Sequence, residues 1–169
     1  MNLLLTGRPG IGKTTVIKAL VGELEARGFQ PGGFVAVEER VAGRRVGFRI
    51  ESLDGRESKI MAHVDLISAV RVGRYGVDVE IIDYVVDTQL PRDRPLTVLD
   101  EIGPMECASS RFVKRVRELL DGPSTVVATV AARGAGFIAE CRDRDDVELV
   151  YVVEDNRDQL ARTIVAGLA

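Results

Sequence analysis

The feature that most constrains the fold is the octapeptide at residues 7–14, Gly-Arg-Pro-Gly-Ile-Gly-Lys-Thr, which matches the phosphate-binding pattern G-x-x-x-x-G-K-[ST]. A short apolar run, Leu3–Leu5, precedes the octapeptide. Apolar residues at helical spacing follow it, namely Val16, Ile17, Leu20, Val21 and Leu24. The order strand, glycine loop and helix is the context that such a loop requires. The sequence therefore predicts a P-loop that opens directly into a helix.

Each part of this loop suits the binding of a polyphosphate. The glycines let the main chain turn tightly, so that its N–H groups point inward and surround an anion. The helix that follows directs its positive end at the same point. Lys13 is expected to reach the terminal phosphates as a catalytic cation, and the Thr14 hydroxyl is expected to ligate Mg²⁺. The predicted nucleotide contacts in this segment are Gly7, Arg8, Pro9, Gly10, Ile11, Gly12, Lys13, Thr14 and Thr15.

A second informative stretch, Leu96–Glu101, is an apolar strand that ends in two acids. In a P-loop protein a carboxylate at this position faces the phosphate loop, so Asp100 is predicted to hold Mg²⁺ directly or through a water. Glu101 is predicted to orient and activate a water that faces the γ-phosphate. This pattern is common by itself, and it indicates a nucleotide site here because the chain also contains a P-loop. Glu106 is either a second acid at the site or the start of the next helix, and the sequence leaves both interpretations open.

Several arginines are candidates to stabilise the charge that develops on the γ-phosphate during phosphoryl transfer. Arg142 and Arg144 are the predicted catalytic arginines, and Arg133 is a further candidate. The alternative for this segment is a surface run of charges with neighbouring ion pairs. Residues 71–78 contain two glycines and two arginines and are predicted to form a loop. This loop is either a solvated connector or a mobile segment that closes over the nucleotide.

The 169 residues are predicted to form one α/β domain, 1–169, with a mostly parallel sheet. An antiparallel β meander is expected over residues 34–62, because short apolar runs there are separated by glycine turns. A helix is expected over residues 79–90. A buried parallel strand is expected over residues 125–130, where β-branched residues are continuous. Ser109 or Ser110 is expected to cap the helix after Glu106, and Asn156 to cap the final helix.

Composition excludes several classes of protein. The formal net charge of −3 makes nucleic acid an unlikely partner for the molecule as a whole, although a local basic patch would escape this argument. The apolar runs are far shorter than a membrane span, and the N-terminal run resembles no signal peptide. Two isolated cysteines, Cys107 and Cys141, predict reduced thiols and a cytoplasmic location. The single histidine, His63, excludes a metal site built from several histidines.

These motifs resemble those of a small nucleoside-triphosphatase family of P-loop proteins, first met in thermophiles and with a human cancer-related member. The resemblance covers nearly the whole chain. It is carried by residues 6–15, 71–78, 100–106 and 138–145, and Asp-Glu-Ile-Gly-x-Met-Glu is its most specific part. Pro104 departs from the pattern, because some members have lysine there, and so does Ala135-Gly136, where some members are richer in His and Pro.

The resemblance implies a three-layer, RecA-like P-loop fold and Mg²⁺-dependent hydrolysis of ATP, GTP and other nucleoside triphosphates to diphosphate and phosphate. It also implies a second set of nucleotide contacts, formed by Leu99, Asp100, Glu101, Ile102, Gly103, Pro104, Met105 and Glu106. The chain has no Asn-Lys-x-Asp guanine reader, so base specificity is expected to be broad. Turnover is expected to be slow unless an arginine reaches the phosphates.

Three other functions remain compatible with the sequence. A nucleoside or nucleotide kinase shares the loop but needs an acceptor pocket, and no acceptor motif is visible. A non-catalytic switch would bind nucleotide without hydrolysing it. A motor-like ATPase would be stimulated by nucleic acid, which the acidic composition disfavours. The sequence leaves protein partners unknown.

Overall fold

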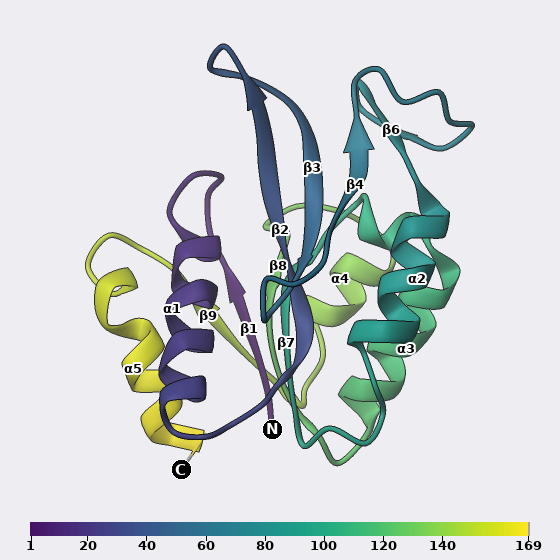
Figure 1. Ribbon diagram of the computed structural model, residues 1–169. Helices are drawn as coiled ribbons and strands as arrows, with labels where there is room; N and C mark the ends of the chain where they lie inside the picture. The colour runs from purple at the N-terminus through teal and green to yellow at the C-terminus, as the bar shows by residue number, and fades with distance from the viewer. Residues whose placement is uncertain (169) are drawn as a thin grey trace.

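A single nine-stranded sheet runs through the computed structural model, which describes residues 1–168, in the order β5-β6-β4-β3-β2-β7-β8-β1-β9 (Figure 1). One half is parallel and consists of β1 (Asn2–Thr6), β2 (Gly32–Val41), β7 (Leu96–Ile102), β8 (Thr125–Val130) and β9 (Val147–Tyr151). The other half is antiparallel and consists of β3 (Arg44–Ser52), β4 (Ser58–His63), β5 (Arg71–Val72) and β6 (Tyr75–Val77). The predicted parallel sheet with an added meander is confirmed.

Helices cover the parallel half on both faces and complete the three layers (Figure 1). One face carries α1 (Lys13–Ala26) and α5 (Arg157–Leu168), which pack against each other. The other face carries α2 (Val79–Gln89), α3 (Ser110–Asp121) and α4 (Phe137–Arg142), with a 3₁₀ turn, η1 (Glu106–Ala108), before α3. Since β8 lies between β1 and β7, the P-loop strand and the acidic strand are separated by one strand.

The alternating side chains of the strands build a separate apolar core on each face of the sheet. Phe34 on β2 lies on the α2–α3 face, where its ring packs 6.1 Å from the ring of Phe112. The next residue, Val35, lies on the other face with the α1 side chains Ile17 and Leu20. Among the described helices, none has the length and apolar character needed to cross a bilayer.

The β2–β3 hairpin extends beyond the parallel part of the sheet (Figure 1). Val35 of β2 pairs with Asp100 of β7, so residues 38–41 continue past the level at which β7 carries its acids. The turn at Ala42 and Gly43 has φ angles of 48° and 76°, the mirror-image turn that fits the twist of a two-residue hairpin. The hairpin tip therefore stands on the same edge of the sheet as the carboxyl ends of the parallel strands.

Three local predictions need comment. Residues 71–78 are not simply a loop, because they form the β5–β6 hairpin, in which Tyr75 and Val77 are buried beside β4. Ser109, rather than Ser110, caps α3 by accepting a hydrogen bond from the Phe112 N–H at 3.0 Å. Asn156 precedes α5 as expected, but its side chain bonds back to the main chain of residues 151 and 153.

Gly33 is the position in β2 at which a side chain is least tolerable. Its φ is +136°, which L residues rarely adopt, and a Cβ there would lie 1.8 Å from the carbonyl oxygen of Val98. The β2 main chain therefore approaches β7 as closely as it does only because this residue is glycine.

We predict that Gly33→Ala lowers the free energy of unfolding by at least about 3 kcal/mol, because both the φ angle and the clash with a main-chain carbonyl oppose it. The matched control is Gly22→Ala in α1, where a Cβ meets no atom within 4 Å. This variant should gain about 0.5–1 kcal/mol, as helical Gly→Ala changes do. Urea unfolding of both variants checks the pair, and equal stabilities would contradict the packing described.

Candidate functional site

The P-loop connects β1 to α1 and is held from the side by the segment that follows β9. Gly7, Gly10 and Gly12 have positive φ angles of 155°, 77° and 109°. A Cβ at Gly7 would lie 2.8 Å from the carbonyl oxygen of Val152, so this first glycine is required for contact between the two segments. Ile11 points into the core and anchors the loop, whereas Arg8, Pro9 and Gly10 are exposed. One side of the loop is thus anchored in the core, and its other side faces solvent.

The N-terminus of α1 has the free N–H groups and the positive potential that favour an anion. Gly12 occupies the N-cap position and supplies no side-chain cap, and no acidic residue lies in the first turn. The first-turn N–H groups therefore lack the intrahelical partners that later residues have. The Lys13 ammonium donates to the Gly7 carbonyl at 3.1 Å, across the mouth of the loop. The structure thus brings together the groups that the sequence predicted for the phosphates.

Asp100 joins three elements of the site through its two carboxylate oxygens. Thr14 of α1 donates to Oδ2 at 2.6 Å, and Thr129 of β8 donates to Oδ1 at 2.5 Å. Asp100 is only 3% exposed, and this burial raises its pKa, which the two hydroxyl donors and Lys13 partly offset. Thr129 was not among the predicted site residues. Its only signal in the sequence was a hydroxyl near the end of an otherwise apolar strand.

A second pair of carboxyl groups lies around Gly103. A Cβ at Gly103 would lie 2.7 Å from Oε1 of Glu101 and 3.0 Å from Oε2 of Glu106, so both side chains converge there. Burial, and then the charge of Asp100, raise the pKa of Glu101, while Lys13 lowers it. Burial, followed by the charge of Glu101, raises the pKa of Glu106 to about 8. At neutral pH Glu106 is therefore mostly protonated and adds little negative charge.

Glu106 begins the 3₁₀ turn η1 and not the next helix, since α3 starts after its cap, Ser109. Glu106 is a buried acid, 3% exposed, and its carboxylate converges with that of Glu101 at Gly103. That it is a second acid of the site stays a prediction. The register between β7 and β8 shifts between Leu99 and Ile102, and the Asp100–Glu101 peptide bond lies at this point and is cis.

The donor set fits a magnesium ion held beside a triphosphate. The Thr14 hydroxyl donates its hydrogen bond to Asp100 and keeps an oxygen lone pair that could ligate a metal, and the Asp100 carboxylate could accept a hydrogen bond from a metal-bound water. Within residues 1–168, no group of three His, Cys, Asp or Glu side chains is arranged to hold a metal alone. Mg²⁺ in proteins is usually held through one or two side chains together with phosphate oxygens and waters, and Thr14 and Asp100 supply two such side chains.

The predicted contacts from residues 99–106 differ in what they can offer a nucleotide. The side chains of Leu99 and Ile102 are fully buried in the core, so only their main chain is available. Pro104 is exposed, whereas Met105 packs against the core.

The candidate arginines lie in three different environments. Arg142 donates to the carbonyls of Ala131 (2.8 Å) and Gly134 (3.0 Å) and so braces the loop after β8, on the P-loop edge. Arg144 pairs with Asp121 and Asp146 near Asn2, where β1 begins, which is the opposite edge of the sheet. The structure therefore does not bring Arg144 to the P-loop; its ion pairs are those of the alternative surface-charge interpretation.

Arg133 is exposed in the loop that Arg142 braces. Another arginine, Arg157, lies directly against the P-loop, and it was not among the predicted catalytic arginines. It donates to the Ile11 carbonyl at 3.4 Å, and its Cδ would lie 3.8 Å from a Cβ at Gly12. Arg8 reaches the same segment by an ion pair with Glu154 at 2.7 Å. No spacing in the sequence indicates these contacts, because they join residues 146 positions apart.

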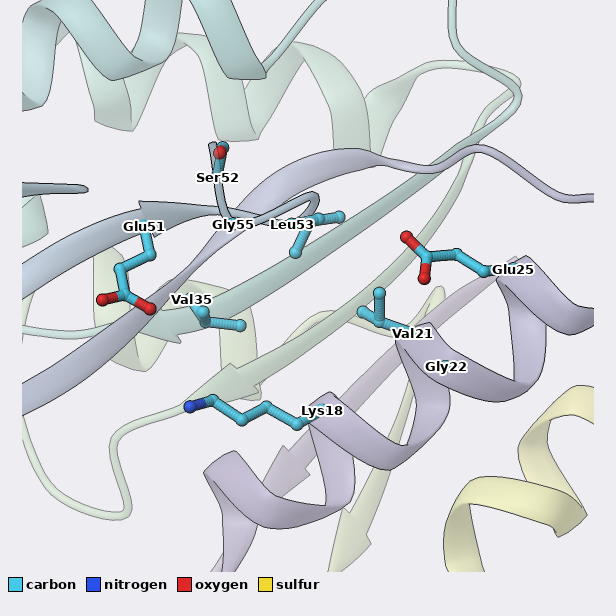
Figure 2. A pocket seen from close by; sticks show the side chains of 9 residues that line it. All are labelled: Lys18, Val21, Gly22, Glu25, Val35, Glu51, Ser52, Leu53 and Gly55. Carbon is cyan, nitrogen blue, oxygen red and sulfur yellow. The ribbon is translucent and has the colours of Figure 1, made fainter. Parts of the chain in front are cut away.

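A separate cavity of about 250 Å³ lies between α1 and the meander (Figure 2). Its walls include Val21, Val35 and Leu53. Lys18 and Glu25 line it from α1, and Glu51 lines it from β3 (Figure 2). Two carboxylates beside an apolar floor would repel a triphosphate. The open P-loop, in contrast, presents N–H groups and Lys13 to it. Of these two places, the charge of the loop is the one that suits phosphate.

Comparisons with known proteins agree with this geometry. The model of a protein family described as NTPase matches residues 2–165. The chain is 39% identical to "Nucleoside-triphosphatase THEP1" of a Thermotoga species, over 99% of this chain and 95% of that protein. It is 41% identical to the protein of the same name in Thermofilum pendens, over 99% and 97%.

Two solved structures are also similar. The crystal structure of THEP1 from Aquifex aeolicus gives a TM-score of 0.85 at 34% identity and covers 99% of both chains. The solution structure of a human cancer-related nucleoside triphosphatase gives a TM-score of 0.82 at 32% identity, covering 99% of this chain and 96% of that one.

The raised pKa of Glu106 predicts a specific pH dependence of stability. The folded-state pKa of about 8 lies above the ordinary value of 4.5, so the folded protein retains a proton that the unfolded chain releases. The free energy of unfolding should therefore fall as pH rises from about 4.5 towards 8, by at most about 1.4 kcal/mol per pH unit.

Urea unfolding between pH 5 and 8, without nucleotide or Mg²⁺, measures this slope. Glu106→Gln keeps the shape of the side chain and removes the titration, so the variant should show a flatter profile. Superimposable profiles for wild type and variant would mean that Glu106 does not titrate in this window.

Proposed function

Since the chain belongs to the nucleoside-triphosphatase family that it matches over nearly its whole length, its activity is the hydrolysis of nucleoside triphosphates, and we propose how its residues perform it. The triphosphate lies in the P-loop, Lys13 contacts its terminal phosphates, and Glu101 positions the attacking water. Thr14 would ligate Mg²⁺, and Asp100 would hold the ion directly or through a water.

The observation that carries this proposal is the position of Glu101 beside both Asp100 and Lys13. Its pKa is raised chiefly by burial. A carboxylate whose pKa lies closer to neutrality is a better proton acceptor at pH 7, and a positioned base contributes about 10²–10⁴ to the rate. Glu101 therefore accepts a proton from the water as the water attacks in line.

The neighbouring groups keep this base in a usable state. Protonated Glu106 avoids placing a second full negative charge beside Glu101, which would otherwise repel the triphosphate. Thr14 and Thr129 hold Asp100 in one orientation. When bound, Mg²⁺ neutralises phosphate charge and polarises the γ-phosphoryl group.

Broad base specificity is supported by the surroundings of the loop. The segment that flanks the P-loop carries Glu154 and Arg157, whose side chains are engaged with Arg8 and Ile11. No Asn-Lys-x-Asp guanine reader accompanies them. Slow turnover is supported by Arg142 and Arg144, both of which bond within the protein, because an arginine on the γ-phosphate is worth about 10³–10⁵ in rate.

A reducing, cytoplasmic setting is part of the proposal and is supported by two free cysteines, Cys107 and Cys141. Burial raises the pKa of both thiols to about 12, so neither is a reactive thiolate at pH 7.

We predict that phosphate release occurs with ATP, GTP, CTP and UTP at rates within about tenfold of one another, and that removal of Mg²⁺ by chelation abolishes it. Phosphate release over this panel is the measurement, with and without added nucleosides as acceptors. Phosphate appearing on an added nucleoside instead of in solution would favour a kinase.

We predict that Glu101→Gln lowers kcat at least about 100-fold while nucleotide binding is retained, because only the base is removed. Lys13→Ala should lose both turnover and tight binding, since the ammonium also holds the phosphates. Single-turnover phosphate release and fluorescent-nucleotide titration separate the two effects. If Glu101→Gln turned over within about twofold of wild type, another group would have to position the water.

A further inference from the structure

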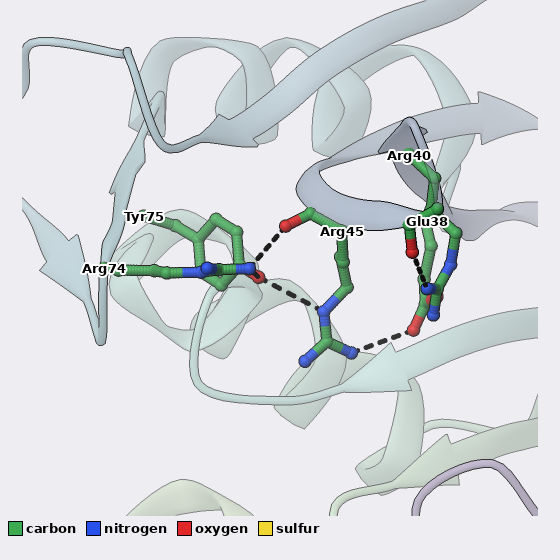
Figure 3. A network of polar contacts seen from close by, with 6 residues as sticks. Glu38, Arg40, Arg45, Arg74 and Tyr75 are labelled. Atoms are coloured by element: carbon green, nitrogen blue, oxygen red, sulfur yellow. Dashed lines mark hydrogen bonds and ion pairs between the residues drawn. The ribbon is translucent and has the colours of Figure 1, made fainter.

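Arg40, Arg45 and Arg74 lie along the tips of the β2–β3 and β5–β6 hairpins (Figure 3), and together with Arg71 we call them the arginine ridge. Arg40 and Arg45 both pair with Glu38, at 2.6 Å and 2.9 Å. Arg45 also donates to the Tyr75 hydroxyl at 3.1 Å, and Arg74 donates to the same hydroxyl at 3.3 Å.

Arg71 completes the arginine ridge by donating to the Arg74 carbonyl at 2.6 Å. The ridge thus consists of Arg40, Arg45, Arg71 and Arg74, and it links two hairpins that are far apart in the sequence.

Few acids compensate the charge of the ridge. Glu38 pairs with two of the four guanidinium groups, those of Arg40 and Arg45. Some exposed arginines elsewhere have a carboxylate of their own, as Arg111 has Asp87. Within residues 1–168, Arg71 and Arg74 have no acid within 4.0 Å.

The neighbouring acid Glu39 does not change this balance, because it faces the other side of the hairpin and lies 3.8 Å from Arg49. The ridge with Glu38 has a formal charge of +3 in a chain whose net charge is −3.

Aromatic rings also hold two of the guanidinium groups, those of Arg45 and Arg74, in place. The Arg45 guanidinium lies 5.3 Å from the centre of the Phe48 ring, and that of Arg74 lies 5.3 Å from the centre of the Tyr75 ring. The two rings pack edge to face, 5.4 Å apart. Side chains fixed in this way lose little rotamer entropy when they bind a ligand, and each guanidinium retains further N–H donors for it.

The ridge stands on the catalytic edge of the sheet. Val35 pairs with Asp100, and Arg40 lies five residues further along β2, which corresponds to about 16 Å of extended strand. A ligand on the ridge would therefore lie above the edge that carries Asp100 and the P-loop.

We propose that the arginine ridge binds the phosphate backbone of a nucleic-acid strand. A row of guanidinium groups matches a linear ligand with repeated phosphates, because each planar group can donate two hydrogen bonds to one phosphate. A local row also reconciles such a partner with an acidic chain, since the rest of the surface repels the strand and directs it to the ridge. Backbone contacts carry no sequence information, so binding is sequence-independent.

The test is binding of fluorescently labelled 20-nucleotide single-stranded DNA and RNA to the full chain by anisotropy, at several salt concentrations and without nucleoside triphosphate. Wild type should bind, and Arg40→Ala/Arg71→Ala should bind about tenfold more weakly. The slope of log K against log salt should fall in magnitude by about 1.4 for two lost phosphate contacts on a single strand.

The matched control is Arg92→Ala/Arg162→Ala, which removes the same charge from exposed positions on other elements. It should bind within about twofold of wild type. Arg40→Lys/Arg71→Lys should retain most of the affinity, which separates lost charge from disturbed folding.

Three results would each overturn the proposal: no binding by wild type at 50 mM salt, equal losses in the ridge and control variants, or equally good competition by polyglutamate of matched charge. Hydrolysis plays no part in this measurement. A negative result would therefore leave the proposed function intact, and an inactive enzyme that bound DNA would leave the ridge intact.

Discussion

The carboxylate of Asp100 is the interaction on which the site depends. It is buried, and it receives one hydroxyl from the helix that follows the P-loop and one from the strand between β1 and β7. These two hydrogen bonds connect α1, β7 and β8 at a single point. A buried charge is tolerated only where such donors compensate its lost hydration, so the threonines and the acid form one unit. The relative positions of the P-loop helix and the acidic end of β7 follow from that unit.

The balance of charge around Glu101 shows how the site can contain three acids and still accept a polyanion. Asp100 is neutralised in part by hydroxyl donors and Lys13, and Glu106 is kept largely protonated by burial, with a pKa of about 8. Glu101 thus stands between one compensated and one neutral acid. The open end of α1 and Lys13 supply the opposite sign on the phosphate side. Burial, more than any ion pair, therefore assigns different roles to three chemically similar side chains.

The antiparallel half of the sheet gives this chain a second feature on the same edge. The meander carries β2 and β3 beyond the parallel strands and places the β5–β6 hairpin beside them. Its tips gather Arg40, Arg45, Arg71 and Arg74, which are spread over 35 residues of sequence. A net charge of −3 hides this arrangement, because formal charge sums over the surface, whereas a ligand meets only one part of it.

The amino-acid sequence determined the chemistry that is local along the chain. The glycine spacing of residues 7–14 and the helical periodicity of residues 16–24 predicted the P-loop and the α/β class, and these predictions hold. The acids after an apolar strand predicted a metal site, and this stays a prediction. Constraints of this kind act between residues that are close along the chain, so they can be recognised in the sequence.

Tertiary structure alone decided which distant side chains meet. It brought Thr129 to Asp100 and Arg157 to the P-loop, kept Arg144 at the opposite edge, and turned residues 71–78 into a hairpin through pairing with β4. Each of these outcomes depends on strand order and register. Those are set by how two apolar faces of one sheet are covered at once, and no single segment contains that information.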